Sequence, residues 1–159
     1  MKPKKIIALI ALLILFSVYY FQEKNKNTST INAIENNKAN FNFLPTSTTG
    51  VVVKHNGYSL SYSEKHEQAE WIAYSLDKKD IVYTNRKRPY FNEDPKVKTK
   101  SADWRSYKNS GYDRGHLCPA GDRRLTLDGY NETFLTSNIS PQNHEFNAGI
   151  WNKLEQKTR

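Results

Sequence analysis

Cysteine is nearly absent from the 159-residue chain, which contains one cysteine and four histidines. One thiol cannot form an internal disulfide, and it cannot supply the ligands of a cysteine-rich zinc module or an iron–sulfur cluster. The histidines are scattered along the chain, which argues against a multi-histidine metal site. The composition therefore excludes a disulfide-stapled mini-protein and a zinc finger.

A single uncharged run follows three lysines at the N-terminus and covers residues 6–21. This pattern is typical of an export signal. As a helix the run would reach about 24 Å, slightly short of the ~30 Å hydrocarbon core of a bilayer. No small-residue cleavage motif follows it, which favours an uncleaved anchor. We expect residues 1–21 to be a signal peptide or membrane anchor helix, with the domain exported: anchored facing outside the cytoplasm, or secreted or periplasmic after cleavage.

Acidic residues are in the minority, because 24 Lys and Arg stand against 16 Asp and Glu, a net charge of +8. The length allows one modest domain. Residues 22–45 are rich in Asn and lack apolar periodicity, which indicates a linker, and residues 46–159 are expected to form the domain. Within it, residues 86–124 hold eleven Lys or Arg against five acidic residues. Such a stretch is either a solvated face or a surface that binds a polyanion.

The domain is expected to contain both strands and helices, and so to be of the α+β class. Asn-Gly at 56–57 separates the runs 51–53 and 58–62, which predicts a β-hairpin. Apolar spacing predicts a helix that begins at Ser63 and a second helix from Asn147 to the C-terminus. Short apolar runs predict two further strands, over 81–84 and 133–136.

The chemistry is expected in residues 111–124, GYDRGHLCPAGDRR. His116 lies there among arginines, and a histidine can take a proton from water beside guanidinium groups that bind phosphate. Taken alone, His116 could equally be a structural histidine. Asn147 and Glu155 lie eight residues apart and near each other across two helical turns. An amide and a carboxylate suit Mg²⁺, so the set fits metal-assisted attack of water on a phosphodiester.

The residues Asp113-Arg114-Gly115-His116, followed by Pro119-Ala120, resemble the DRGH motif of the DNA/RNA non-specific endonucleases. The resemblance runs from about Tyr58 through Glu155 in five ordered blocks. It implies a ββα-metal (His-Me finger) nuclease domain with an antiparallel sheet, here preceded by the N-terminal hydrophobic helix. The implied substrates are DNA and RNA, single- or double-stranded, and no protein partner is inferred.

The resemblance implies a role for three residues at the reacting centre. His116 resembles the general base that deprotonates the attacking water. Asn147 resembles the single protein ligand of a hydrated Mg²⁺, for which Mn²⁺ can substitute. Glu155 resembles a carboxylate that orients the metal-bound waters.

Three further positions match supporting residues of the family. Asn138 resembles an amide near the base and the phosphate, and Arg114 resembles an arginine that positions the substrate. The family also uses an arginine upstream of its Phe-x-x-Asp-Pro element. Arg88 and Arg86 both fit that position, with Arg88 preferred.

The chain stops at Arg159, soon after the predicted metal-binding helix, whereas the family domain normally continues. We therefore expect the C-terminal part of the domain to be missing. This leaves two hypotheses: a metal-dependent non-specific endonuclease, or a truncated nucleic-acid-binding remnant without activity.

Other conspicuous side chains are expected to be structural. Cys118 is expected to be a packed thiol, and His55 and His66 to lie on the surface. Trp71 and Trp151 are expected in the core. Trp104 is expected to pack as well, although a tryptophan can also stack on a base.

Overall fold

The computed structural model describes residues 14–23 and 44–159. They belong to two units, Met1–Phe43 and Leu44–Arg159. In the first unit, residues 14–23 are helical and exposed. No helix in the described ranges is both long and apolar enough to cross a bilayer. The remainder of the predicted signal or anchor and most of the predicted linker lie outside the described residues, so both stay predictions.

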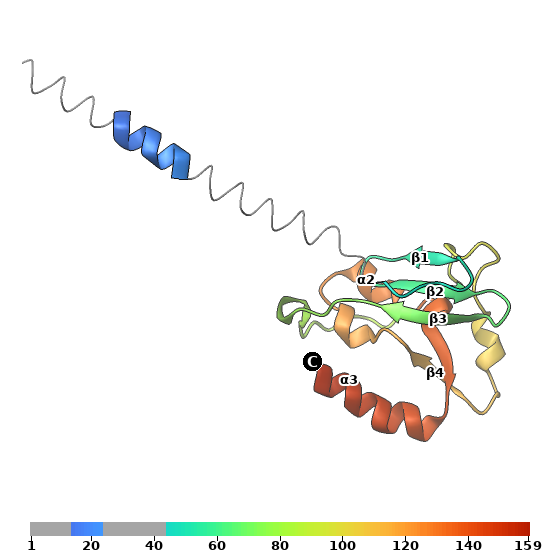
Figure 1. Ribbon diagram of the computed structural model, residues 1–159. Helices are drawn as coiled ribbons and strands as arrows, with labels where there is room; N and C mark the ends of the chain where they lie inside the picture. The colour runs from blue at the N-terminus through green and yellow to red at the C-terminus, as the bar shows by residue number, and fades with distance from the viewer. Residues whose placement is uncertain (1–13, 24–43) are drawn as a thin grey trace, which may run out of the picture. The chain divides into compact units, whose positions relative to one another are not determined.

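Three antiparallel strands form the first sheet of the domain and lie side by side in Figure 1. They are β1 (Val52–Lys54), β2 (Ser59–Ser63) and β3 (Gln68–Ala73), with β2 in the centre. The predicted hairpin is confirmed, because β1 pairs with β2 and the His55 N–H donates to the Tyr58 carbonyl across the Asn-Gly turn at 2.8 Å.

The predicted helix from Ser63 is wrong, because β3 occupies most of that segment. Glu67 adopts the left-handed conformation, with φ of 53°, where the chain turns back. β3 then pairs along the whole of β2, with one register shift, which satisfies the backbone groups on that side of the strand. The spacing of Ala69, Ile72 and Ala73 fits a helix, but a run this short follows its tertiary partner rather than its own periodicity.

A second sheet and the C-terminal helix form the other half of the domain. β4 (Asp113–His116) pairs with β5 (Ile139–Gln142) in antiparallel fashion. The helix α2 (Leu127–Glu132) lies between them in sequence. A π-helix, Phe146–Trp151, follows β5 and continues into α3 (Asn152–Thr158), which runs to the end of the chain in Figure 1. The mixed helix and antiparallel-sheet fold and the C-terminal helix are therefore confirmed.

The two strands predicted over 81–84 and 133–136 are wrong. Residues 81–84 adopt no regular structure, and Leu135 makes only an isolated bridge with Asn92. Short β-branched runs become strands only where a sheet edge is available to pair with them. Short 3₁₀-helices complete the described elements; they span Lys78–Asp80, Trp104–Tyr107, Ala120–Arg123 and Thr136–Asn138.

Two buried clusters form the core. The first lies along β1 and β2 and includes Cys118, so the prediction of a packed thiol is confirmed, and burial raises the pKa of Cys118 to about 11. The second is largely aromatic and lies beside β5. Its members, called here the aromatic cluster, are Phe91, Tyr107, Tyr130, Phe134 and Ile139.

A buried histidine and carboxylate connect the first sheet to the rest of the domain. His55 Nε2 lies 2.9 Å from Asp94 Oδ2, and both side chains are fully buried, so the expected surface position of His55 is wrong. Ser137 Oγ donates to the same Oδ2 at 2.6 Å. Burial opposes ionisation of Asp94, but the hydrogen bonds from His55 and Ser137 outweigh it and lower its pKa.

We expect Asp94→Ala to lower the free energy of unfolding by about 3–5 kcal/mol, because it leaves the buried His55 and Ser137 without an acceptor. Since the pKa of Asp94 is lowered on folding, this stabilisation should be present above the ordinary carboxyl pKa of 3.8 and be lost as the pH falls below it. Urea unfolding measures both effects. The exposed control Asp128→Ala should cost less than about 1 kcal/mol. Equal losses for the two variants would contradict the assignment.

Candidate active site

The close approach of β5 to β4 explains the glycine of the DRGH segment. Gly115 lies opposite Ser140, and the Gln142 side chain covers it. A Cβ at position 115 would meet Gln142 Cδ and Oε1 far inside contact distance. A side chain at position 115 would therefore have to displace the Gln142 side chain that packs across the two strands.

His116, the last residue of β4, sits in an aromatic slot. Its ring lies 5.0 Å from the Phe134 ring, edge-on, and 5.7 Å from Phe91. Nε2 is buried and has no hydrogen-bond partner. Burial, with a smaller contribution from the positive charge of Arg88, lowers the pKa of His116 to about 4. The imidazole is therefore neutral at pH 7 and can accept a proton.

Arg88 and Arg114 lie against the same aromatic rings as His116. The Arg88 guanidinium lies 5.5 Å from the centres of both Phe91 and Phe134. The Arg114 guanidinium lies 5.1 Å from Phe91. Contacts with ring faces hold these cations in place while leaving their N–H groups available for an anion.

Two hydrogen bonds join the C-terminal helical segment to the two ends of β4. Asn147 Nδ2 donates to Asp113 Oδ2 at 3.0 Å, and Trp151 Nε1 donates to the His116 carbonyl at 3.0 Å. His144 Nδ1 lies 2.9 Å from the same Asp113 oxygen. Asp113 had no role assigned from the sequence, although its place in the DRGH motif was a signal. Hydrogen bonds from Asn147 and His144 lower its pKa and keep it ionised.

The π-helix changes which residues share a face of the helical segment. The Asn152 N–H donates to the Asn147 carbonyl, five residues back. Eight residues of α-helix would leave Asn147 and Glu155 about 80° apart. A π turn takes roughly one residue more per turn, which reduces that difference to about 20°. Asn147 and Glu155 therefore point in nearly the same direction.

Glu155 is half-buried on α3, and its burial raises its pKa. Arg159 Nη2 lies 3.9 Å from Glu155 Oε2, one turn further along the helix. Arg159 also pairs with the buried Asp122. Glu155 therefore lies within a small group of charged side chains beside the helix and is not surrounded by bulk solvent.

Asn138 is fully buried and bonded only to the backbone. Its Oδ1 accepts from the Cys118 N–H at 2.8 Å, and its Nδ2 donates to the carbonyls of Cys118 and Thr133. These bonds place Asn138 close to the segment that carries His116, and its supporting role near the base and the phosphate stays a prediction. Asn138 fixes the segment that follows His116, two residues along the chain.

A cleft of about 430 Å³ brings four of the discussed residues together. Arg88, Arg114, Asp113 and Asn147 line it, together with Lys108. Of the two candidate upstream arginines, Arg88 is thus placed at the cleft. Arg86 instead donates to the carbonyls of Arg124 and Leu125.

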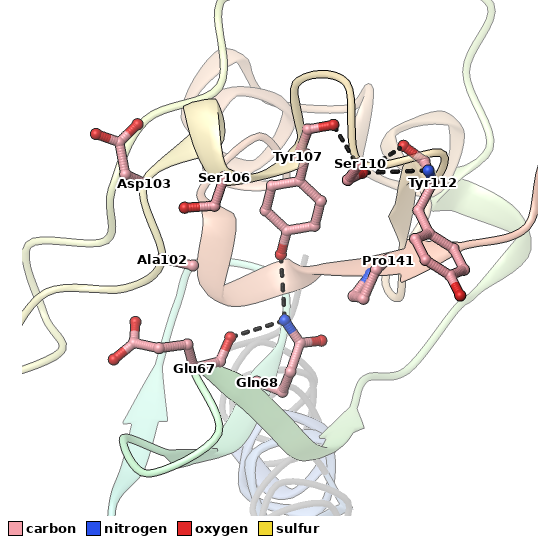
Figure 2. Close-up of a pocket in the computed structure, with 9 residues that line it drawn as sticks. All are labelled: Glu67, Gln68, Ala102, Asp103, Ser106, Tyr107, Ser110, Tyr112 and Pro141. Atoms are coloured by element: carbon pink, nitrogen blue, oxygen red, sulfur yellow. Dashed lines mark hydrogen bonds between the residues drawn. The ribbon is translucent and has the colours of Figure 1, made fainter.

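A second hollow, of about 470 Å³, adjoins the cleft and has a different character (Figure 2). Tyr107 and Tyr112 line both spaces. Figure 2 shows Tyr107 bonded to Gln68, while the carboxylates of Glu67 and Asp103 stand on the same side of the hollow. We call it the acid-lined hollow, and its charge makes it unsuited to a polyanion.

The family model for DNA/RNA non-specific endonucleases matches residues 22–159. The mitochondrial nuclease EXOG of Danio rerio is 42% identical over 102 residues, which are 63% of this chain and 30% of that protein. A nuclease of Nostoc sp. is 36% identical over 109 residues, 65% of this chain and 38% of that protein. The chain thus spans roughly a third of the length of these curated relatives.

A solved structure is similar to this chain in its fold as well. The "Crystal structure of the EndoG/EndoGI complex: Mechanism of EndoG inhibition" contains a chain that matches with a TM-score of 0.65 and 31% identity. The match covers 72% of this chain and 48% of that chain. The described domain therefore corresponds to about half of a known nuclease fold.

We expect Arg88→Ala to raise the pKa of His116 above about 4, because the positive charge of Arg88 disfavours the imidazolium. Burial remains, so the pKa should stay below 6.5. NMR titration of the imidazole measures the change. Arg86→Ala is the matched control, since Arg86 bonds only to backbone carbonyls, and it should leave the His116 pKa where it is. A shift of equal size in both variants would contradict the assignment to Arg88.

Proposed function

Because the chain belongs to the family of DNA/RNA non-specific endonucleases, we propose that it hydrolyses phosphodiester bonds in DNA and RNA with one divalent cation. One observation carries the proposal: Arg88, Arg114 and Asn147 line one cleft, and Arg88 shares its aromatic contacts with His116. The cleft itself is lined by phosphate-binding cations and a metal-binding amide, and His116 lies beside it against the rings that Arg88 also contacts. A base, such cations and such an amide are the groups that this reaction needs.

His116 acts as the general base in this proposal. It takes a proton from the water that attacks phosphorus, while the bond from phosphorus to the 3′ oxygen breaks. A pKa of about 4 keeps the imidazole neutral but makes it a weak base. A phosphate bound to Arg88 neutralises the charge that disfavours protonation. Substrate binding therefore raises the pKa of His116, so the imidazole is a stronger base in the complex with substrate than in the free chain.

Asn147 is suited to hold the cation. Its Nδ2 is committed to Asp113, which leaves the carbonyl oxygen Oδ1 as the atom that can bind a metal. Within residues 14–23 and 44–159, no three His, Cys, Asp or Glu side chains form a group that could hold a metal ion. A cation bound mainly through waters and one protein oxygen matches the behaviour of Mg²⁺, and Mn²⁺ can replace it. When bound, it would supply positive charge to the phosphate and the leaving oxygen.

Glu155 and the cleft cations complete the proposed site. Glu155 points in nearly the same direction as Asn147, so it can accept hydrogen bonds from waters around the cation. Arg88, Lys108 and Arg114 give the cleft an excess of positive charge over Asp113. Contacts with phosphate carry no sequence information, so cleavage of both DNA and RNA with little sequence preference follows.

The alternative is a chain that binds nucleic acid but does not cleave it. The relatives that match are about twice as long as this chain, since 102 residues are 30% of one and 109 residues are 38% of the other. Ile150 and Leu154 on the C-terminal helix are also largely exposed. Metal-dependent cleavage by the purified 159-residue chain decides between the two.

We expect His116→Ala to lower the cleavage rate roughly 10²–10⁴-fold, the range for loss of a general base, while the affinity for DNA stays nearly unchanged. Cleavage of a labelled duplex and binding in EDTA measure the two quantities. His66 is exposed in the turn before β3, so His66→Ala is the matched control and should cleave at the normal rate. Normal cleavage by His116→Ala would remove this residue from the mechanism.

We expect Asp113→Ala to raise the Mg²⁺ concentration for half-maximal cleavage about 10–100-fold, because Asp113 orients the Asn147 amide. Saturating Mg²⁺ should restore most of the rate. Asn147→Ala should stay inactive at any Mg²⁺ concentration, and EDTA should stop the normal chain.

Metal titrations of the cleavage rate test these expectations, with the remote Asp128→Ala as control. Full activity in EDTA would contradict the metal-dependent mechanism. An unchanged metal requirement in Asp113→Ala would contradict the orienting role.

A further inference from the structure

An aromatic hollow also adjoins the cleft. It has a volume of about 560 Å³ and shares Arg88 and Arg114 with the cleft. Its other walls include the rings of Tyr90, Phe91 and Trp104. Positive charge and aromatic surface therefore meet directly beside the place where a phosphate would bind.

Trp104 supplies the accessible ring surface of this hollow. It is 38% exposed, whereas the neighbouring Phe91 is buried. The Arg114 guanidinium lies 5.9 Å from the Trp104 ring and 5.1 Å from Phe91, so one arginine connects both rings. Arg105 also lies against the Trp104 ring, at 5.7 Å, and with both arginines in contact the residue still keeps 38% of its surface exposed.

A short rigid element holds Trp104 in place. It is the first residue of the 3₁₀-helix Trp104–Tyr107, whose capping residue Asp103 accepts from the Arg105 N–H at 2.8 Å. Tyr107 at the other end is buried and donates to the Ile139 carbonyl. The ring is therefore presented to the hollow by a backbone anchored in the aromatic cluster.

We propose that Trp104 stacks on the nucleobase next to the phosphate that Arg114 binds, and so makes an unpaired strand the preferred substrate. The proposal rests on the proposed nuclease function. Every base offers a flat π surface, so stacking adds affinity without selecting a sequence. A base inside a duplex is already stacked on its neighbours and has to leave them first.

The charge distribution decides which side of the cleft receives the base. The residues that line the acid-lined hollow include no Lys or Arg, and although Asp103 is paired with Arg105 at 2.7 Å, the Glu67 carboxylate disfavours the backbone phosphates of a strand there. The aromatic hollow carries Arg88 and Arg114, which attract them. A strand leaving the cleft is therefore directed past Trp104.

The test compares two strands of equal length, one of thymidines and one without any bases. Fluorescence anisotropy in EDTA measures their binding to the full chain. The normal chain should prefer the thymidine strand, and Trp104→Ala should lose about 5- to 100-fold in affinity for it but little for the abasic strand. Trp104→Phe should keep most of the preference. Tyr83, 92% exposed and outside the cleft and both adjoining hollows, provides the aromatic control Tyr83→Ala, which should bind both strands normally.

The outcomes separate stacking from catalysis. Equal losses on both strands, or none on either, would overturn the stacking role even if the normal chain cleaves DNA. A loss confined to the thymidine strand would support it even if the chain cleaves nothing. In a chain that does cleave, Trp104→Ala should slow cleavage of single strands more than cleavage of duplex, and the opposite order would contradict the preference for unpaired strands.

Discussion

The site depends on the attachment of one helical segment to one short strand. Asp113 at the start of β4 holds the side chain of Asn147, and the carbonyl of His116 at its end holds the indole of Trp151. The metal-binding candidate and the base are thereby fixed to the same strand. Neither helix nor strand is long, so these two bonds, rather than intrinsic helix stability, set the distance across the cleft. Loss of either bond would loosen the site before it unfolded the domain.

The residues around His116 also determine its protonation state. An imidazole packed against Phe91 and Phe134 loses hydration, and Arg88 adds a positive charge nearby. Both effects favour the neutral form. The arrangement costs stability below pH 6.5, because the unfolded chain can bind a proton that the folded chain excludes until about pH 4. The cost falls at the position of the proposed base, and strongly perturbed pKa values are typical of functional sites.

Predictions from the sequence were correct where neighbouring residues determine the local structure. They were wrong where a segment distant in the sequence determines it. Asn-Gly at 56–57 specifies its hairpin by turn chemistry alone, and the helix from Asn147 is visible in its own periodicity. β3 was read as a helix because its pairing with β2 is not encoded in its spacing. His116, Arg88, Arg114, Asn138 and Asn147 were proposed through a motif. The contact of Asp113 with Asn147 was not predicted, because it depends on which amide the carboxylate meets in the folded chain.

The π-helix shows that knowing which residues form a site does not determine how they are arranged in space. A regular helix would have turned Glu155 well away from Asn147, and the sequence contains no residue that announces the wider turn. In this register the Trp151 indole donates to the His116 carbonyl at 3.0 Å. The extra residue in one turn therefore has two effects. It lets the helix attach to β4, and it brings the Asn147 amide and the Glu155 carboxylate to the same side of the helix. Irregular helical turns of this kind recur at functional sites because regular ones cannot meet both demands.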